Sequence, residues 1–329
     1  MRSLFIIALC AIASFSSATT LKIATLSPDG SAWMVQMRIA AKDIEAQTEG
    51  RVKFKFYPGG VMGSDAAVIR KMKIGQLHGG ALTGGALAKF APDTQVYNLP
   101  FIFKSFEEVD YVRERMDSTI IQSFADAGYT IFGLAEGGFA YVLSTSPTDT
   151  FEKLKQSKIW SPDNDVLVQK SMAKFNLGTI PLGLGDVLPA LQTGMVDTVT
   201  TSPIGAIALQ WHTKVTHITD MPILYFYGIL AIKNKAYKKI SQSDQVIVGQ
   251  VMGQSFKKID KINRQDNVDA MNALQALGIK KIDMQQTDRD MLQGQAESLA
   301  QSMLAEQQFS KSAYDEIQKY LTEFRGAAE

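Results

Sequence analysis

The stretch Leu21-Lys-Ile-Ala-Thr25 alternates apolar and polar side chains and predicts a β-strand at the beginning of the fold. Val52-Lys-Phe-Lys-Phe-Tyr57 repeats this alternation, and Gly79-Gly-Ala-Leu82 is a short apolar run, so each predicts a further strand. Helical patterns fill the two gaps, the first closed by Gly50 and the second running from Asp65 to about Ile74. This strand–helix–strand–helix–strand order predicts a mostly parallel sheet with helices on its faces.

A second α/β unit follows farther along the chain. We expect strands near residues 130–134 and 139–145, and three more at 158–161, 179–182 and 197–200, with helices between them. This order predicts a second mostly parallel sheet, so the chain should form two α/β lobes.

The last third of the chain connects the two units. Residues 225–232 predict a strand that returns to the first lobe. Residues 243–277 predict one long helix, whose apolar face begins at Val248 and continues through Val268, and Gly278 ends it. The chain should therefore cross between the lobes more than once.

These elements give an expected domain organisation. The first lobe should hold residues 19–138 with about 226–260, and the second lobe should hold residues 139–225. Residues 278–329 are mostly helical and polar, and we expect them to pack on the lobes. Because ligands bind at the carboxyl ends of strands in such sheets, the expected cleft lies between the lobes.

The N-terminal segment has the pattern of an export signal. Arg2 is positively charged, residues 4–13 are apolar, and residues 16–18 are small. We expect residues 1–18 to be removed on export, and the alternative is an uncleaved N-terminal anchor. Since Cys10 is the only cysteine, the mature chain would carry no thiol that could mispair in an oxidising compartment.

The charge balance argues against some partners. The chain has 34 Lys and Arg residues against 33 Asp and Glu residues, so there is no electrostatic reason to expect nucleic acid or an anionic membrane surface. No stretch after the signal is long and apolar enough for a transmembrane helix. We expect a soluble, monomeric mature chain.

Residue types that carry catalysis or bind metals form no motif in this sequence. No pair among His78, His212 and His217 has the i, i+4 spacing of a helical metal site. Gly183-Leu-Gly185 lacks the third glycine of a dinucleotide-binding loop, and the sequence has no Gly-x-Ser-x-Gly elbow. We therefore expect no catalytic residue, no metal and no cofactor, as in a secreted binding protein and unlike an enzyme.

Short fragments along nearly the whole mature chain carry a family resemblance through their order and spacing. These are Thr48-Glu-Gly-Arg-Val52, Tyr57-Pro-Gly-Gly60, Met62-Gly-Ser-Asp65, Lys73-Ile-Gly-Gln76, Asn98-Leu-Pro-Phe-Ile-Phe103, Leu154 to Ile159, Ala190-Leu-Gln-Thr-Gly194 and Val196-Asp197. Together they resemble the solute-binding receptors of tripartite ATP-independent periplasmic (TRAP) transporters, the DctP-type dicarboxylate-receptor family.

The resemblance implies the fold class and the function. It implies a periplasmic binding protein with two α/β lobes, a long helix lying across both lobes, and a cleft that closes on a small organic solute. It also implies that membrane subunits of the transporter receive this solute.

The sequence differs from the family at several positions that, by the resemblance, would contact the solute. The family's arginine, which clamps the solute carboxylate in a two-pronged bond, is Trp160 here, and a second basic residue is Ala140. The family's Glu-Asn pair is Thr200 and Thr201, and an acidic residue of the first lobe aligns with Thr83. An indole cannot replace a guanidinium, because it has one N–H donor and no charge.

Each candidate residue has a structural interpretation beside the functional one. Trp160 is expected to form an aromatic wall of the cleft, and the alternative is a core tryptophan at a strand end. Asp65 contacts the ligand or only caps its helix, and capping is the simpler interpretation. The aromatic candidates equally fit core packing. The full set of candidate ligand-binding residues is Trp160, Thr83, Thr201, Ala140, Asp65, Trp33, Asp186, Trp211 and Tyr225.

Two ligand classes and two rival functions stay open on the sequence alone. The ligand is an organic acid held by threonine hydroxyls, backbone N–H groups and a displaced lysine or arginine, or it is an amine or neutral aromatic that rests on Trp160. A sensory or scaffold protein that binds a partner is the main alternative to a transport receptor. An enzyme on the same scaffold would need an acid, base or metal that the sequence does not show.

Overall fold

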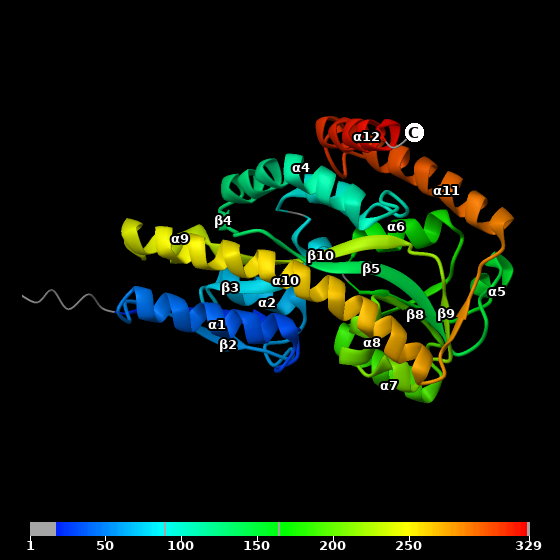
Figure 1. The fold of residues 1–329 in the computed structure, drawn as a ribbon, viewed down its shortest axis with the longest axis horizontal. Coiled ribbons are helices and arrows are strands. Elements are labelled where there is room, and N and C mark those ends of the chain that lie inside the picture. The colour runs from blue at the N-terminus through cyan, green and yellow to red at the C-terminus, as the bar shows by residue number, and fades with distance from the viewer. Residues whose placement is uncertain (1–17, 89, 164, 328–329) are drawn as a thin grey trace, which may run out of the picture.

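The computed structural model describes residues 18–88, 90–163 and 165–327, so the expected signal segment lies outside the described residues except for Ala18. Figure 1 shows two α/β halves side by side, with one long helix lying across both of them. We call the half built around strands β1, β2 and β3 the first lobe, and the half built around β6, β7 and β8 the second lobe.

The first lobe contains the parallel unit that the opening residues predict. Strand β1 (Thr19–Thr25) lies between β2 (Val52–Tyr57) and β3 (Gly79–Thr83) and is parallel to both. Helices α1 (Ala32–Gln47) and α2 (Asp65–Lys73) connect these strands. The strand–helix–strand–helix–strand prediction is therefore confirmed.

The second lobe repeats the arrangement. Strand β6 (Ile159–Pro162) is parallel to both β7 (Thr179–Leu182) and β8 (Thr198–Thr201). The helices of this lobe are α5 (Phe151–Lys155), α6 (Val166–Lys174), α7 (Val187–Thr193) and α8 (Pro203–Ala208).

Two long strands join the lobes. Strand β10 (Leu224–Lys233) is antiparallel to both β3 and β5 (Leu134–Ser144), and β5 is antiparallel to β8. Among the described residues, the expected two sheets therefore merge into one sheet of 11 strands. The lobe limits predicted at residues 138–139 and 225–226 fall inside these crossing strands.

The remaining elements complete the two lobes. The strands expected near 130–134 and 139–145 are a two-residue β4 and the single long β5. The short strands are β4 (Tyr129–Thr130), β9 (His217–Thr219) and β11 (Lys280–Ile282), and the other helices are α3 (Gly84–Leu87), α4 (Phe106–Asp126) and α9 (Asn234–Tyr237).

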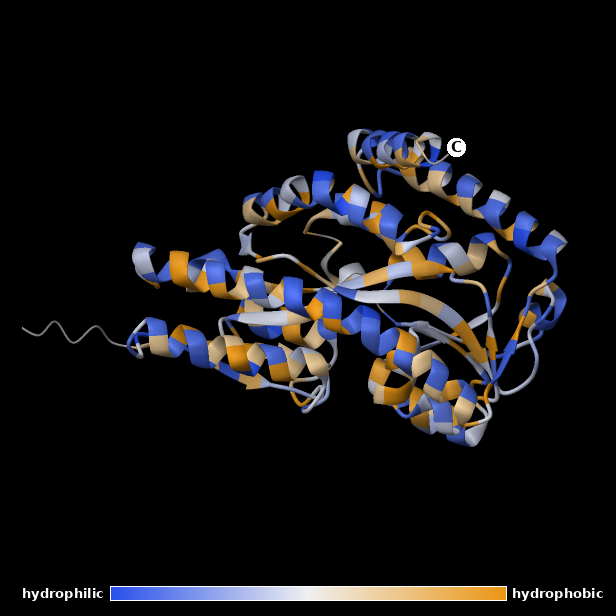
Figure 2. Ribbon diagram, in the orientation of Figure 1, coloured by the Kyte–Doolittle hydropathy of each residue, from blue (hydrophilic) through white to orange (hydrophobic). Residues whose placement is uncertain are grey.

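The long helix α10 (Gln242–Ala276) matches the predicted range of residues 243–277. It begins at Ser241, whose hydroxyl accepts a hydrogen bond from the backbone N–H of Asp244 at 3.1 Å, as an N-cap does. Met252 packs in a core cluster of the first lobe, and Leu274 packs in a core cluster of the second. Figure 2 shows hydrophilic residues near the middle of α10, where it passes β5.

The two C-terminal helices lie against α4 of the first lobe and against each other. Helix α12 (Lys311–Gly326) buries Ile317 and Leu321 in the same core cluster as Val112 of α4, and α11 (Gln286–Ala305) leads into it. Arg325 of α12 forms an ion pair with Glu108 of α4 at 2.7 Å. Within the part of the chain that the structure describes, no helix has the length and apolarity that crossing a membrane requires.

Candidate functional site

Asp65 and Thr83 meet at the edge of the first lobe that faces the second. The backbone N–H and the hydroxyl of Thr83 donate to Oδ2 of Asp65 at 3.1 and 2.8 Å. The other oxygen, Oδ1, is buried and has no hydrogen-bond partner among the described residues. Ser64, not Asp65, occupies the N-cap position of α2, so the expectation that Asp65 caps this helix is wrong: its carboxylate turns toward Thr83 instead.

Burial, hydrogen bonds and a neighbouring charge act together on the pKa of Asp65. Burial raises the pKa of Asp65 above its ordinary value, and the hydrogen bonds from Thr83 act against this rise. The charge of Asp163, which follows β6 in the second lobe, also raises this pKa. A buried carboxylate oxygen without a donor is costly, so this position suits a ligand group that donates a hydrogen bond.

The two lobes touch beside this position. Asp165 of the second lobe caps α6, because its Oδ1 accepts from the backbone N–H of Val168 at 3.1 Å. A Cβ atom built on Gly85 of α3 would lie 2.1 Å from Oδ2 of Asp165, so a side chain at this position would force Asp165 to shift. Burial raises the pKa of Asp165, while backbone hydrogen bonds at the start of α6 lower it.

A cavity of about 300 Å³ lies next to this contact and is shared by both lobes and the end of α11. Gln95 of the first lobe lines it, and the Nε2 atom of this side chain is buried without a partner among the described residues. The residues that line the cavity are Ala66, Ile69, Gly85, Ala86, Ala88, Pro92, Gln95, Val166, Leu167, Met303, Gln307 and Gln308. Sequence reasoning missed Gln95 and Asp165, which carry no motif.

Trp160 and Trp211 lie together inside the second lobe. Their ring centroids are 5.2 Å apart with the rings nearly perpendicular, and both side chains belong to one core cluster. The indole N–H of Trp160 donates to the carbonyl of Leu182 at 3.0 Å. Because this is the only N–H of the side chain, Trp160 can offer a ligand only the face or edge of its ring. The packing of Trp160 against Trp211 is also what the alternative, a core tryptophan, requires.

Ala140 and Tyr225 lie on the crossing strands β5 and β10, and Thr201 is the last residue of β8 beside them. Ala140 pairs with Leu224 of β10, and Thr201 pairs with Tyr141 of β5. All three candidates are buried, and Tyr225 is fully enclosed, with its hydroxyl hydrogen-bonded to Glu136 and Arg113.

Trp33 and Asp186 lie apart from the other candidates. Trp33 is half-buried against a core cluster of the first lobe, and Asp186 is exposed at the start of α7. The structure thus brings together Asp65 with Thr83 and Trp160 with Trp211, and it places Trp33 and Asp186 elsewhere. The ligand contacts of all nine candidates stay predictions.

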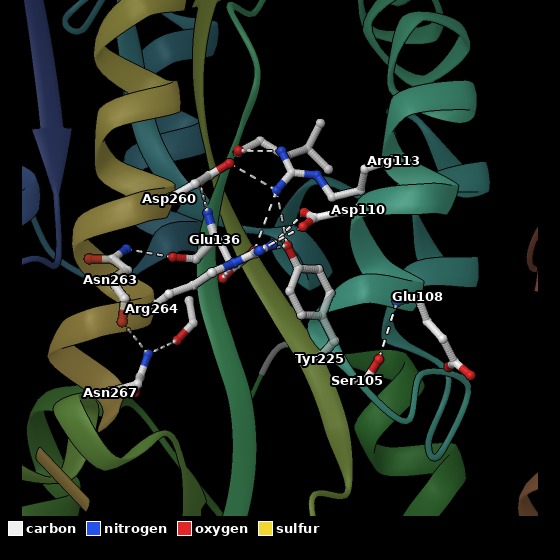
Figure 3. Close-up of polar contacts among 12 residues, drawn as sticks. Ser105, Glu108, Asp110, Arg113, Glu136, Tyr225, Asp260, Asn263, Arg264 and Asn267 are labelled. Atoms are coloured by element: carbon white, nitrogen blue, oxygen red, sulfur yellow. Dashed lines mark hydrogen bonds and ion pairs between the residues drawn. The ribbon is translucent and has the colours of Figure 1, made fainter. Parts of the chain in front are cut away.

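A buried charged network lies where the crossing strands meet α10, and sequence reasoning missed it (Figure 3). Both carboxylate oxygens of Glu136 on β5 accept hydrogen bonds from Arg264 of α10 at 2.8 Å. Arg113 of α4 donates to Asp260 of α10 at 3.0 Å and lies 3.8 Å from Glu136. Burial raises the pKa of Glu136, and the bonds from Arg264 oppose that rise. The network therefore fixes α4, β5 and α10 to one another.

The signal that could have revealed this network is the spacing on α10. Asp260, Asn263, Arg264 and Asn267 stand at i, i+3, i+4 and i+7, so they form one polar stripe on the helix. The predicted apolar face instead ran through Val268, which is 54% exposed. No cluster of three or more side chains suited to a metal ion occurs within residues 18–88, 90–163 and 165–327.

Residues 23–307 match the family described as bacterial extracellular solute-binding protein, family 7 (DctP). The chain belongs to this family. The match confirms the resemblance that the sequence fragments indicate, and it is to a solute-binding family rather than to a family of enzymes.

Relatives and solved structures agree with this membership. The chain is 24% identical to a solute-binding protein of Verminephrobacter eiseniae, over 93% of this chain and 90% of the relative. It is 25% identical to the C4-dicarboxylate-binding periplasmic protein DctP of Rhodobacter capsulatus, over 71% of each chain. A TRAP periplasmic solute-binding protein of Xanthobacter autotrophicus with bound β-D-galacturonate superposes with a TM-score of 0.84 at 17% identity, covering 92% of this chain and 99% of that one. The expected two-lobed fold is confirmed.

Proposed function

We propose that this chain is the periplasmic receptor of a TRAP-type transporter and that it captures a small hydroxylated organic acid between its lobes. Membrane subunits of the transporter then take the solute from it. We further propose that the receptor is a monomer, that residues 1–18 are removed on export, and that the solute leaves chemically unchanged. Membership of a solute-binding family and the close approach of the lobes at Gly85 and Asp165 support this proposal.

The observation that carries the solute class is the unpartnered oxygen of Asp65. An ionised carboxylate only accepts hydrogen bonds, so a solute group beside Oδ1 has to be a donor such as a hydroxyl. A plain dicarboxylate has no such donor when ionised, whereas a sugar acid has several. The galacturonate bound to the Xanthobacter autotrophicus protein is a solute of this kind.

The carboxylate end of the solute needs a different partner from the family's arginine. Trp160 occupies that position, and its N–H already donates to Leu182. We propose that neutral donors take over this role, namely threonine hydroxyls such as that of Thr201 and backbone N–H groups. The ring of Trp160 would then cover one side of the solute.

A thermal-shift screen of the mature chain tests this function. The panel pairs D-galacturonate and D-glucuronate with the neutral sugars D-galactose and D-glucose, and adds succinate, malate, amines and neutral aromatics. At a hundred times its dissociation constant, a ligand of the folded state stabilises it by about 2.7 kcal/mol. With about 0.65 kcal/mol/K of unfolding entropy for roughly 310 residues, this corresponds to a rise in Tm of about 4 °C.

Each outcome of the screen has one meaning. A rise with hydroxylated acids and none with the neutral sugars supports the proposal. A rise only with amines or neutral aromatics contradicts the acid assignment and favours a solute that rests on Trp160. No rise with any compound contradicts capture of these solutes and favours the partner-binding alternative.

A further inference from the structure

The crossing strand β5 contains a bulge that leaves backbone groups without partners in the sheet. Its pairing with β10 shifts register between Phe226 and Tyr227, so Gly137 is the extra residue on β5. Gly138 beside it has a φ of +93°, which favours glycine. The bulge lies shortly before Tyr141, from which β5 pairs with β8 of the second lobe.

Side chains of α10 satisfy these backbone groups. Asp260 accepts from the backbone N–H of Glu136 at 2.7 Å, and the amide of Asn263 donates to the carbonyl of Glu136. The amide of Asn267 donates to the carbonyl of Gly137 at 3.3 Å (Figure 3). Buried backbone groups need such partners, and Asp260, Asn263 and Asn267 supply them.

Asn267 differs from its neighbours because it also binds the second lobe. Its Oδ1 accepts from the backbone N–H of Ile204 at 3.2 Å, in the first turn of α8, where N–H groups lack partners inside the helix. Asn263 makes no such contact with α8 among the described residues. The Asn267 side chain is 8% exposed, so both of its contacts are shielded from water.

The other polar contacts of α10 hold it to the first lobe. Arg264 binds Glu136 and Asp110, and Asp260 binds Arg113, so α10 is fixed to α4 and to the start of β5. Asn267 comes next along the helix, and it bonds the bulge and α8 at once. It therefore stands at the point where the first lobe's fixed elements meet the second lobe.

We propose that Asn267 is a positioning residue that holds the second lobe against the bulge in the closed arrangement and thereby sets solute affinity without touching the solute. This proposal rests on the proposed function only for its affinity readout. Loss of either amide contact shifts the equilibrium toward separated lobes. Because an apparent dissociation constant scales inversely with the fraction of binding-competent protein, affinity falls in proportion.

The test compares Asn267→Leu with Asn263→Leu as the matched control. Both variants remove an asparagine amide that donates to the bulge, but only the first removes a contact with α8. Asn267→Asp is a third variant, because it can still accept from Ile204 yet no longer donates to Gly137. Urea unfolding of each variant shows that it is folded before the lobes are measured.

Lobe separation is measured directly with spin labels. The mature chain has no cysteine of its own, so the labels can be attached to Val61→Cys in the first lobe and Met195→Cys in the second. Val61 is 70% exposed and Met195 is 53% exposed, so both positions are accessible to the label. Distances are recorded without solute and with D-galacturonate, and dissociation constants are measured by calorimetry. This readout distinguishes a positioning role from a merely structural one.

We expect Asn267→Leu to enlarge the separated population and to raise the dissociation constant about five- to tenfold, the effect of roughly one hydrogen bond. Asn263→Leu should lower the urea midpoint and leave the distances unchanged. Equal distance distributions for wild type, Asn267→Leu and Asn267→Asp would overturn the proposal. If the wild type binds no panel acid, the proposed function fails, and the solute-free distances still decide the role of Asn267.

Discussion

Glu136 has the most buried carboxylate of the charged network, and its loss should be costly. Glu136→Gln keeps the shape of the side chain but removes the negative charge between Arg264 and Arg113. The side chain of Glu136 is fully buried, and each of its two oxygens accepts one hydrogen bond from Arg264 at 2.8 Å. Removing one member of a buried ion pair costs about 3–5 kcal/mol, because the charge that remains loses its buried partner.

The same arginine provides a matched control. Arg264 also forms a two-pronged pair with Asp110 at 2.7 and 2.6 Å, but the Asp110 side chain is 61% exposed. Asp110→Asn should therefore cost no more than about 1 kcal/mol, because solvent screens exposed pairs.

Urea and thermal unfolding measure both variants. With about 0.65 kcal/mol/K of unfolding entropy for roughly 310 residues, Glu136→Gln should lower Tm by about 5–8 °C, and Asp110→Asn by less than about 2 °C. Equal effects of the two variants, or a loss below about 1 kcal/mol for Glu136→Gln, would refute the reasoning that burial makes this contact strong.

Three further predictions concern Asp65, Gly85 and Trp160. As pH rises from about 3.8, the folding stability of Asp65→Asn should increase relative to that of wild type. The reason is that the pKa of Asp65 is raised in the folded chain, so the unfolded chain releases this proton first and wild type loses stability. Urea midpoints from pH 3 to 7 measure the difference between the two proteins, and a constant difference would count against this prediction. Gly85→Ala should weaken solute binding without lowering the urea midpoint, because the added Cβ would meet Asp165 only when the lobes close. The control is Gly253→Ala on α10, where a Cβ has open space. Equal solute affinities of the two variants would contradict this prediction. Trp160→Phe should cost about 1 kcal/mol of unfolding free energy through the lost bond to Leu182, and an unchanged urea midpoint would show that this bond contributes nothing.

Local sequence patterns predict most of the strands and helices of the fold. Alternation in β1 and β2 and the glycine after the long helix predict their elements correctly, because burial on one face and helix termination are local effects. The merging of two expected sheets into one could not be predicted this way. It depends on pairing between β5 and β10, which are far apart in the sequence, and on a bulge at Gly137 in the strand that serves both lobes.

The long helix shows why the site was harder to predict than the fold. Its apolar stripe is correct from Val248 to Ile259 but wrong at Val268, because the helix there lies over the bulge and turns Asn267 inward instead. A polar residue facing a strand bulge has no sequence motif of its own. For the same reason Gln95 and Asp165 could not be found, since their positions depend on how the lobes come together.

The most direct test of the account is a calorimetric titration of the chain without residues 1–18 with D-galacturonate and D-glucuronate, each compared with D-galactose and D-glucose. The account predicts saturable binding of at least one acid with one site per chain, no binding of the neutral sugars, and recovery of the acid unchanged after long incubation. Binding of the neutral sugars as tight as that of the acids, no binding of either acid, or conversion of the acid to a product would contradict it.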